Sequence, residues 1–271
     1  MAHQPFFDAA LLGILQGITE FLPISSDGHL ALAELLFKVE VGGLTFNVML
    51  HAGTLLATLL VLRTHVGRAI YESALAARQP SRLRTTQGGR DALVVVLASV
   101  PTGVIGLTLR DPVERWTHSP LVVGIGFLLT SAAVCSTYWV RPGQREQPTW
   151  AGAHVIGVLQ GLAVLPGLSR SGSTIAGALW LGVRPDRAFE LSFLMSLPAV
   201  LGAILLEGRH AVTEPFPVAS AVIGAGVALA TGIVALRALR RVVVKGRFAV
   251  FALWTVPVAL ATLAMALVWP R

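Results

Sequence analysis

The sequence has few charged side chains: Asp, Glu, Lys and Arg make up 13% of its 271 residues, whereas hydrophobic residues make up 54%. With a mean hydropathy of +0.72, this composition excludes an ordinary soluble globular domain. Cysteine is nearly absent, and because Cys135 is the single one, an internal disulfide is excluded. The first residues lack the basic start and small-residue cleavage pattern of a signal peptide, so we expect no cleaved leader.

What the chain does have is long apolar stretches. A helix needs about 17–25 mostly apolar residues to cross the ~30 Å hydrocarbon core of a bilayer. We therefore predict an all-α polytopic membrane protein with six transmembrane helices. The expected spans are 46–62, 92–109, 120–140, 188–206, 216–236 and 248–269.

The net charge of +7 comes from basic residues that lie mainly between these spans. Basic residues in such places orient membrane helices, so we expect no nucleic-acid partner. If the segment 63–91 is cytoplasmic, alternation of the spans places 15 Lys and Arg residues inside and 5 outside, with Arg170 on neither side. This asymmetry predicts that both termini lie outside.

Two further apolar regions, 8–37 and 151–183, are interrupted in the middle by Pro, Gly, Ser and charged residues. Proline ends a helix by removing a backbone donor, and Ser or Asp can cap the next one. Non-helical backbone at membrane depth is tolerated only where protein buries it or where it lines a wet cavity. We therefore predict two re-entrant helical hairpins facing an interior site; the alternative is that both patches are merely loops.

The two interrupted regions resemble each other. The tripeptide "LQG" at 15–17 recurs at 159–161, a period of 144 residues, and "LPISSDG" matches "LPGLSRSG" with one inserted residue. Three spans separate the hairpins, so the hairpins enter from opposite faces of the membrane. We expect one integral-membrane domain over 1–271, built as an inverted-topology repeat. Repeat one covers 8–140 and repeat two covers 151–269, each a hairpin plus three spans.

The stretch "PGLSRSGST", residues 166–174, opens the second half of the second hairpin. Free backbone N–H groups and the positive end of a helix dipole make such a start an anion site. The planar guanidinium of Arg170 can hold two phosphate oxygens, and we predict a phosphate cradle. Its members are Ser169, Arg170, Ser171, Gly172, Ser173 and Thr174. The alternative is an arginine that reaches for the membrane surface beside hydroxyls that bind only backbone.

The first hairpin carries complementary groups. Gln16 and Glu20 are four residues apart, on one helical face, and their oxygens suit a hard divalent cation such as Mg²⁺; helix packing of Gln16 and a structural role for Glu20 are the alternatives. Ser25 and Ser26 lie close to His29, so a hydroxyl and an imidazole are candidates for nucleophile and base. Opposite a phosphate cradle, these groups predict phosphoryl transfer; helix caps are the alternative.

The stretches "LQGITEFLPISSDGHL" (15–30) and "PGLSRSGST" (166–174) resemble the two signature motifs of the undecaprenyl-diphosphate phosphatase family, the integral-membrane bacitracin-resistance proteins. The resemblance continues in "FNVMLHAGTLLA" (46–57) and "FELSFLMSLPAVLGA" (189–203). It implies removal of the terminal phosphate from a C55 polyprenyl diphosphate, which recycles the lipid carrier for peptidoglycan synthesis. It also implies a multi-pass protein of the bacterial inner membrane, with a site reached from the outer face, a divalent cation (Mg²⁺, or else Ca²⁺) and a homodimer.

Carried over by motif, the resemblance makes Ser26 the nucleophile, His29 the acid/base and Arg170 the diphosphate anchor, with Ser25 among the diphosphate-binding hydroxyls. Gln16 and Glu20 take the (Glu/Gln)xxxGlu positions, which implies a role for them at the metal.

Asp27 departs from the family pattern, which has Thr or Ser there. A carboxylate would repel a diphosphate unless it binds the metal, pairs with Arg170 or caps a half-helix that begins at Gly28, and we expect the cap. Glu190 is a second acid in a family-like context, and a functional role and a pairing with Arg187 are both open.

A transporter is the alternative function. Inverted repeats with broken helices are transporter architecture, and a polyprenyl-phosphate flippase needs the same anion cradle. Ser26, His29 and Glu20 favour the enzyme, because hydrolysis requires such groups and translocation does not.

Overall fold

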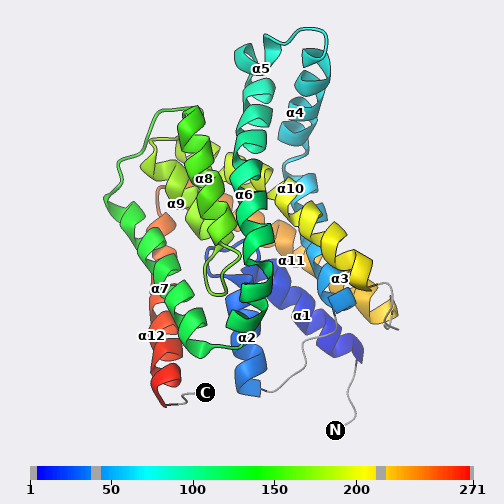
Figure 1. Ribbon diagram of the computed structural model, residues 1–271, viewed down its shortest axis with the longest axis vertical. Helices are drawn as coiled ribbons and strands as arrows, with labels where there is room; N and C mark the ends of the chain where they lie inside the picture. Colours follow the sequence, from blue (N-terminus) through cyan, green and yellow to red (C-terminus); the bar gives the residue numbers. More distant parts are fainter. Residues whose placement is uncertain (1–4, 38–43, 212–217, 269–271) are drawn as a thin grey trace.

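The computed structural model describes residues 5–37, 44–211 and 218–268, and these fold into α-helices and two short 3₁₀ helices (Figure 1). The helices are α1 (Pro5–Thr19), α2 (Ser26–Phe37), α3 (Leu44–Val61), α4 (Arg63–Ala76), α5 (Arg82–Thr85), α6 (Gln87–Thr117), α7 (Pro120–Ser136), η1 (Thr137–Trp139), α8 (Trp150–Leu162), α9 (Arg170–Trp180), α10 (Pro185–Ala211), α11 (Val218–Val244), η2 (Phe248–Phe251) and α12 (Ala252–Val268). The predicted all-α class is confirmed.

Five segments are long and apolar enough to cross a membrane: Gln87–Val113, Pro120–Trp139, Pro185–Gly208, Val218–Val244 and Phe248–Val268. They coincide with five of the six expected spans. The sixth, around α3, qualifies only if α3 and α4 count as one span, and these two helices are bent by 79° relative to each other. An integral, multi-pass membrane protein with five or six crossings is therefore confirmed, whereas the bend was not predicted.

Both interrupted regions are helix–turn–helix units. In the first, α1 ends at Thr19 and α2 begins at Ser26; in the second, α8 ends at Leu162 and α9 begins at Arg170. Pro23 and Pro166 lie within the turns, where a residue without a backbone N–H does not interrupt a helix. In each unit a short proline-containing turn therefore joins two half-helices, and polar residues gather at the start of the second one.

Glycines bring the first helix of each unit against a long helix of the other half of the chain. A Cβ added at Gly13 or Gly17 of α1 would lie 2.5 Å or 1.9 Å from atoms of α11. A Cβ at Gly157 of α8 would lie 2.3 Å from Ala98 O of α6, and Gly161 faces α6 as well. The pairs α1–α11 and α8–α6 thus pack through glycines 144 residues apart.

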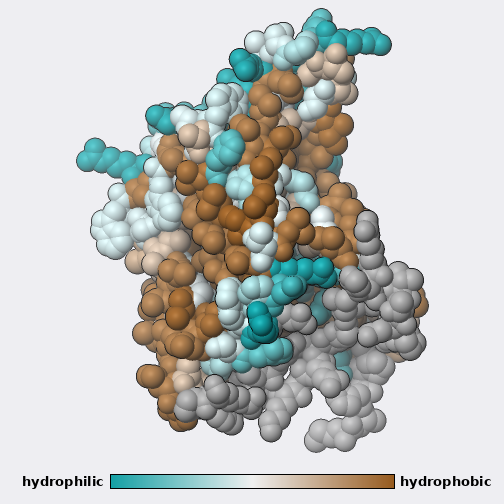
Figure 2. Space-filling view, viewed as in Figure 1, coloured by the Kyte–Doolittle hydropathy of each residue, from teal (hydrophilic) through white to brown (hydrophobic). Residues whose placement is uncertain are grey.

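The surface agrees with a membrane environment. Figure 2 shows hydrophobic side chains over most of the visible face, with hydrophilic residues at the end that carries α4 and α5 and in a smaller group lower down. Large apolar side chains such as Val100, Leu107 and Leu253 are mostly exposed. A contiguous surface of this kind is unfavourable in water and favourable in lipid.

Candidate active site

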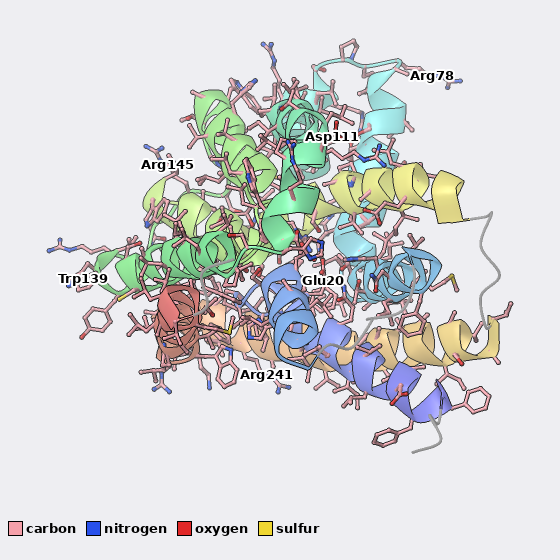
Figure 3. All side chains as sticks on the ribbon, turned by 60° about the horizontal axis from the view of Figure 1, so that its bottom comes forward. Glu20, Arg78, Asp111, Trp139, Arg145 and Arg241 are labelled. Atoms are coloured by element: carbon pink, nitrogen blue, oxygen red, sulfur yellow. The ribbon has the colours of Figure 1, made fainter. Side chains whose placement is uncertain are left out.

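The turns of the two helix–turn–helix units touch each other. A Cβ at Gly28, in the first turn of α2, would lie 2.8 Å from Gly167 Cα, and one at Gly172 in α9 would lie 3.4 Å from Pro23 Cβ. Gly167 has φ +86°, a left-handed conformation that glycine adopts without strain. This contact brings residues 150 positions apart together in the middle of the bundle, where Figure 3 shows Glu20.

The Glu20 carboxylate is the centre of the site. Arg170 Nη2 donates to Glu20 Oε1 at 2.5 Å, and Ser26 Oγ donates to Glu20 Oε2 at 3.0 Å. Both Ser26 and Arg170 are the first residue of their helix, one in each unit. The side chains of Glu20 and Arg170 are 8% and 16% exposed, so the ion pair is largely shielded from solvent.

Gln16 completes the surroundings of Glu20. Its Nε2 donates to Glu20 Oε2 at 3.2 Å and lies 3.2 Å from His51 Nδ1, which we assign as the acceptor. The amide cannot be flipped without placing its oxygen against the carboxylate. Gln16 Oε1 is therefore left buried, with no hydrogen-bond partner among the described residues.

An orphaned buried oxygen beside a carboxylate fits a hard cation. Mg²⁺ is commonly held by one or two carboxylates together with waters and substrate phosphates. Gln16 Oε1 and the Glu20 carboxylate are the oxygens that the chain offers, and in the described part of the chain no group of three or more His, Cys, Asp or Glu side chains could hold a metal. The residues therefore fit a cation that is shared with a phosphate ligand.

The predicted cradle lies at the start of α9 and is mostly occupied by its own contacts. Ser169 caps the helix, because its Oγ accepts from Gly172 N at 3.1 Å and lies 3.3 Å from Ser171 Oγ. Thr174 Oγ1 donates to Arg170 O at 2.8 Å and lies 2.6 Å from Ser192 Oγ. Ser173 is also buried. Of the cradle's side chains, Arg170 is the one directed at Glu20.

The start of α2 differs from the expectation. We expected Asp27 to cap a half-helix beginning at Gly28, and this was wrong: α2 begins at Ser26, and Ser25 Oγ accepts from Gly28 N at 3.3 Å. Ser25 has φ +68°, a left-handed conformation, whereas a regular N-cap residue lies in the β region. Asp27 lies in the first turn with an exposed side chain, where a carboxylate interacts favourably with the helix dipole.

Ser26 and His29 are not in contact. His29 Nδ1 lies 2.8 Å from Ser25 O, and Trp254 Nε1 donates to His29 Nε2 at 3.0 Å. The hydroxyl of Ser26 donates to Glu20 instead. The expected serine–imidazole pair is therefore absent from this conformation, and a carboxylate stands where the imidazole was expected.

Comparison with known proteins adds to this geometry. A family model described as "Bacitracin resistance protein BacA" matches residues 9–261. The chain belongs to this family. Relatives named undecaprenyl-diphosphatase include one from Desulfatibacillum aliphaticivorans, 38% identical over 252 residues (89% of this chain, 91% of the relative). One from Desulfosudis oleivorans is 40% identical over 261 residues (89% and 92%), and one from Bacteroides fragilis is 35% identical over 265 (95% and 97%).

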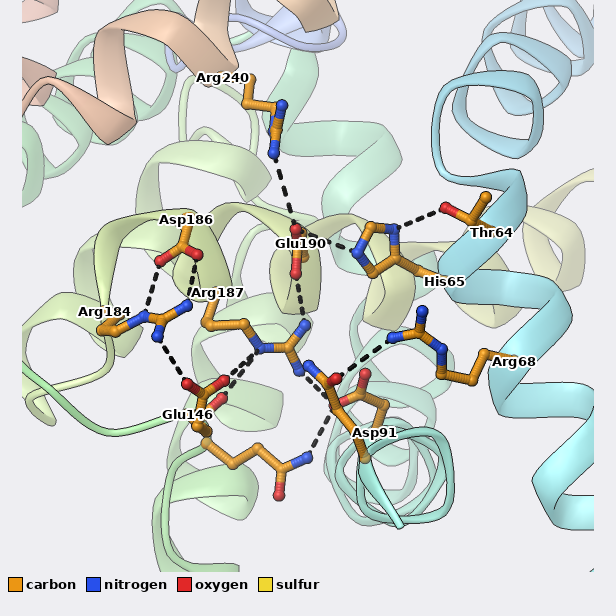
Figure 4. Close-up of polar contacts among 12 residues, drawn as sticks. Thr64, His65, Arg68, Asp91, Glu146, Arg184, Asp186, Arg187, Glu190 and Arg240 are labelled. Atoms are coloured by element: carbon orange, nitrogen blue, oxygen red, sulfur yellow. Dashed lines mark hydrogen bonds and ion pairs between the residues drawn. The ribbon is translucent and has the colours of Figure 1, made fainter.

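This member of the family has a second buried polar cluster, shown in Figure 4. Arg187 is 2% exposed; it donates through Nη1 to Glu190 and through Nη2 to Asp91 Oδ1 at 2.5 Å. Its Nε donates to Glu146 O at 3.2 Å. His65 Nε2 lies 3.1 Å from Glu190 Oε1. Of the two roles left open for Glu190, the structure shows the pairing with Arg187.

A row of three packed aromatic rings runs from the residue after Glu20 to the residue before Glu190. Phe21 lies 5.8 Å from Phe193, and Phe193 lies 5.0 Å from Phe189, between ring centroids. Phe21 follows Glu20 in the chain and Phe189 precedes Glu190. The two polar regions are therefore distinct.

Sequence reasoning did not identify Thr130 or Trp254. Thr130 Oγ1 donates to Gly167 O and accepts from Ser169 N, both at 2.8 Å, and so fixes the second turn from α7. Single polar or aromatic residues in apolar spans carry no spacing that would point to these contacts.

Proposed function

We propose that this protein is an undecaprenyl-diphosphatase, which hydrolyses the terminal phosphate of a C55 polyprenyl diphosphate and recycles the lipid carrier for peptidoglycan synthesis, conferring bacitracin resistance. Membership of the family and the names of the relatives support this. The observation that carries it is the Glu20 carboxylate, which accepts a hydrogen bond from Ser26 of the first helix–turn–helix unit and one from Arg170 of the second. An acceptor, a hydroxyl and an anion-binding guanidinium are the parts that phosphoryl transfer requires.

Arg170 binds the diphosphate in this proposal. In the free protein its charge is balanced by Glu20, and a diphosphate offers more negative charge and a matching pair of oxygens. The N-terminus of α9, directly behind Arg170, adds its helix dipole. Substrate binding therefore turns the guanidinium from Glu20 to the phosphate and leaves the carboxylate free to act.

Ser26 then attacks the terminal phosphorus, and Glu20 accepts the hydroxyl proton. The new bond is Ser26 Oγ–P, the bond that breaks joins this phosphorus to the bridging oxygen, and undecaprenyl phosphate leaves. Water hydrolyses the phosphoserine to give inorganic phosphate and restores Ser26. We assign the base to Glu20 rather than His29, because the Ser26 hydroxyl lies within hydrogen-bond reach of the carboxylate.

Gln16 and Glu20 would hold the divalent cation, Mg²⁺ or Ca²⁺. When bound, it would neutralise charge on the transferring phosphate. The unpartnered Gln16 Oε1 supports this assignment.

We propose six membrane crossings and two re-entrant hairpins related as an inverted repeat, in the bacterial inner membrane, with the site reached from the outer face. The packing of α1 on α11 and of α8 on α6, in which each helix contacts one from the other repeat, supports the inverted repeat.

Arg82 and Arg115 lie near opposite ends of α6. In a Cys135-free background, we expect an impermeant thiol reagent to reach a cysteine at 82 only from the cytoplasm and one at 115 only from outside. Equal sidedness would overturn the topology.

Phosphate release tests the activity. Purified protein in detergent, with excess Mg²⁺, is expected to release phosphate from a polyprenyl diphosphate, and Glu20→Ala is expected not to. A flippase would release none, because detergent offers no leaflets to cross.

We further propose that the protein is a homodimer. Light scattering of the same sample measures its mass, and the mass of a monomer would refute the proposal.

A further inference from the structure

The His29 ring is held by contacts from α12, from α7 and from the first turn. Trp254 of α12 stacks on it with ring centroids 6.1 Å apart and planes at 13°, and Phe127 of α7 meets it edge-on at 5.2 Å. Its nitrogens contact Trp254 Nε1 at 3.0 Å and Ser25 O at 2.8 Å. Among the described residues, those that contact the His29 ring in these ways are all uncharged.

These contacts define the protonation of the imidazole. An indole N–H can only donate, so His29 Nε2 must be the acceptor and carries no proton. His29 Nδ1 then carries the proton and donates it to Ser25 O. A chain of two hydrogen bonds therefore runs from Trp254 through His29 to the backbone of the first turn.

The end of this chain is the strained residue beside the proposed nucleophile. Ser25 has φ +68°, a conformation that non-glycine residues adopt only when their surroundings hold them there. The next residue is Ser26, whose hydroxyl lies 3.0 Å from Glu20 Oε2. A rotation of the Ser25 peptide would move this hydroxyl away from the carboxylate.

We infer that Trp254 is a positioning residue of the phosphatase site, which acts through His29 to hold the left-handed Ser25 and thereby keeps the Ser26 hydroxyl on Glu20. The inference rests on the proposed function, because it concerns the rate of the same reaction. Trp254 is 54% exposed, so core packing does not account for its place against His29.

Trp254→Phe tests this, since it keeps an aromatic ring and removes the N–H. Trp180→Phe is the matched control: Trp180 is 45% exposed and donates its indole N–H to Ser136 Oγ at 2.9 Å, at the end of α9 remote from Arg170. We expect kcat for phosphate release to fall about tenfold in Trp254→Phe with KM within about twofold, and Trp180→Phe to match wild type. Equal kcat in both variants would overturn the inference, whereas an inactive wild type would refute the proposed function itself.

A spectroscopic measurement does not depend on catalysis. In ¹⁵N spectra of histidine-labelled protein, the His29 signals are those lost in His29→Asn. Wild type is expected to show the neutral Nδ1–H tautomer. An Nε2–H tautomer in wild type would overturn the inference even if Trp254→Phe did not fold.

Discussion

Glu20 with Arg170, and Arg187 with Asp91 and Glu190, are both arginine–carboxylate groups shielded from solvent, but they differ in how completely their hydrogen bonds are satisfied. Arg187 uses all three guanidinium nitrogens on two carboxylates and a backbone carbonyl. Within the part of the chain that the structure describes, the Arg170 guanidinium makes one hydrogen bond, to Glu20. The Arg187 cluster joins helices, whereas Arg170 keeps donors for a ligand.

The surroundings differ in the same direction. Next to Glu20 lie an unpartnered amide oxygen of Gln16, a serine hydroxyl and the left-handed Ser25. Arg187 and Glu190 lie three residues apart within the continuous helix α10. Buried charge alone is therefore a weak sign of function, whereas unused hydrogen-bonding groups and backbone strain beside the charge are a stronger one.

Ser26→Ala is the largest expected effect and tests whether the Glu20 region is catalytic. If Ser26 is the nucleophile, phosphate release falls by more than about 1,000-fold, and Ser26→Ala combined with Glu20→Ala loses no more than the single variants, since the two act as one unit. Initial rates with excess Mg²⁺ measure this, with Ser25→Ala for comparison. Activity within about tenfold of wild type, roughly 1.4 kcal/mol, would leave Ser26 as a binding hydroxyl.

Arg187→Met tests the other half of the comparison. It leaves Asp91 and Glu190 buried without their partner, which costs about 3–5 kcal/mol of stability. We expect a clearly lower Tm in detergent and an unchanged turnover per folded molecule. Adding Asp91→Asn and Glu190→Gln should recover most of the lost stability, because no unpaired charge remains. A loss of turnover in the folded fraction would contradict the structural role.

Arg170→Lys keeps the charge of the Glu20 region but not its planar pair of donors. We expect turnover to fall by about 100-fold, roughly 2.7 kcal/mol, because an ammonium does not reproduce bidentate recognition of a phosphate. The Tm should stay within a few degrees of wild type, since lysine can still pair with Glu20. Phosphate release near the wild-type rate would remove Arg170 as anchor.

Ser25→Gly and Ser169→Gly give the smallest expected difference. Both serines accept an N–H three residues on, at 3.3 Å and 3.1 Å, but only Ser25 is left-handed, at φ +68° against −73°. Glycine removes a strain of about 1 kcal/mol at Ser25 and loses a few tenths of a kcal/mol of capping at either site. The Tm should therefore rise slightly for Ser25→Gly and fall for Ser169→Gly; the reverse order would show that Ser25 is unstrained.

Much of the site was predictable because charge stands out in an apolar chain. Glu20 and Arg170 stand out as charges at membrane depth, Ser26 follows from the family motif, and the structure brings the three side chains together. The pairing of Ser26 with His29 was wrong because it relied on sequence spacing, whereas the imidazole turns back to Ser25 O and is held by Trp254, 225 residues away. α3 and α4 meet at a leucine, Leu62, rather than at a proline or glycine. The sequence therefore gives no sign of the 79° bend there.

The sequence by itself determined five of the membrane-spanning helices and the two interruptions between half-helices, because hydropathy and proline act over a few neighbouring residues. Only the tertiary structure decided which side chains meet. Gly13 and Gly17 allow α1 to approach α11, and Gly28 allows the two turns to touch. The resulting positions place Arg170 and Ser26 on one carboxylate, and this depends on the close approach of segments far apart in the chain.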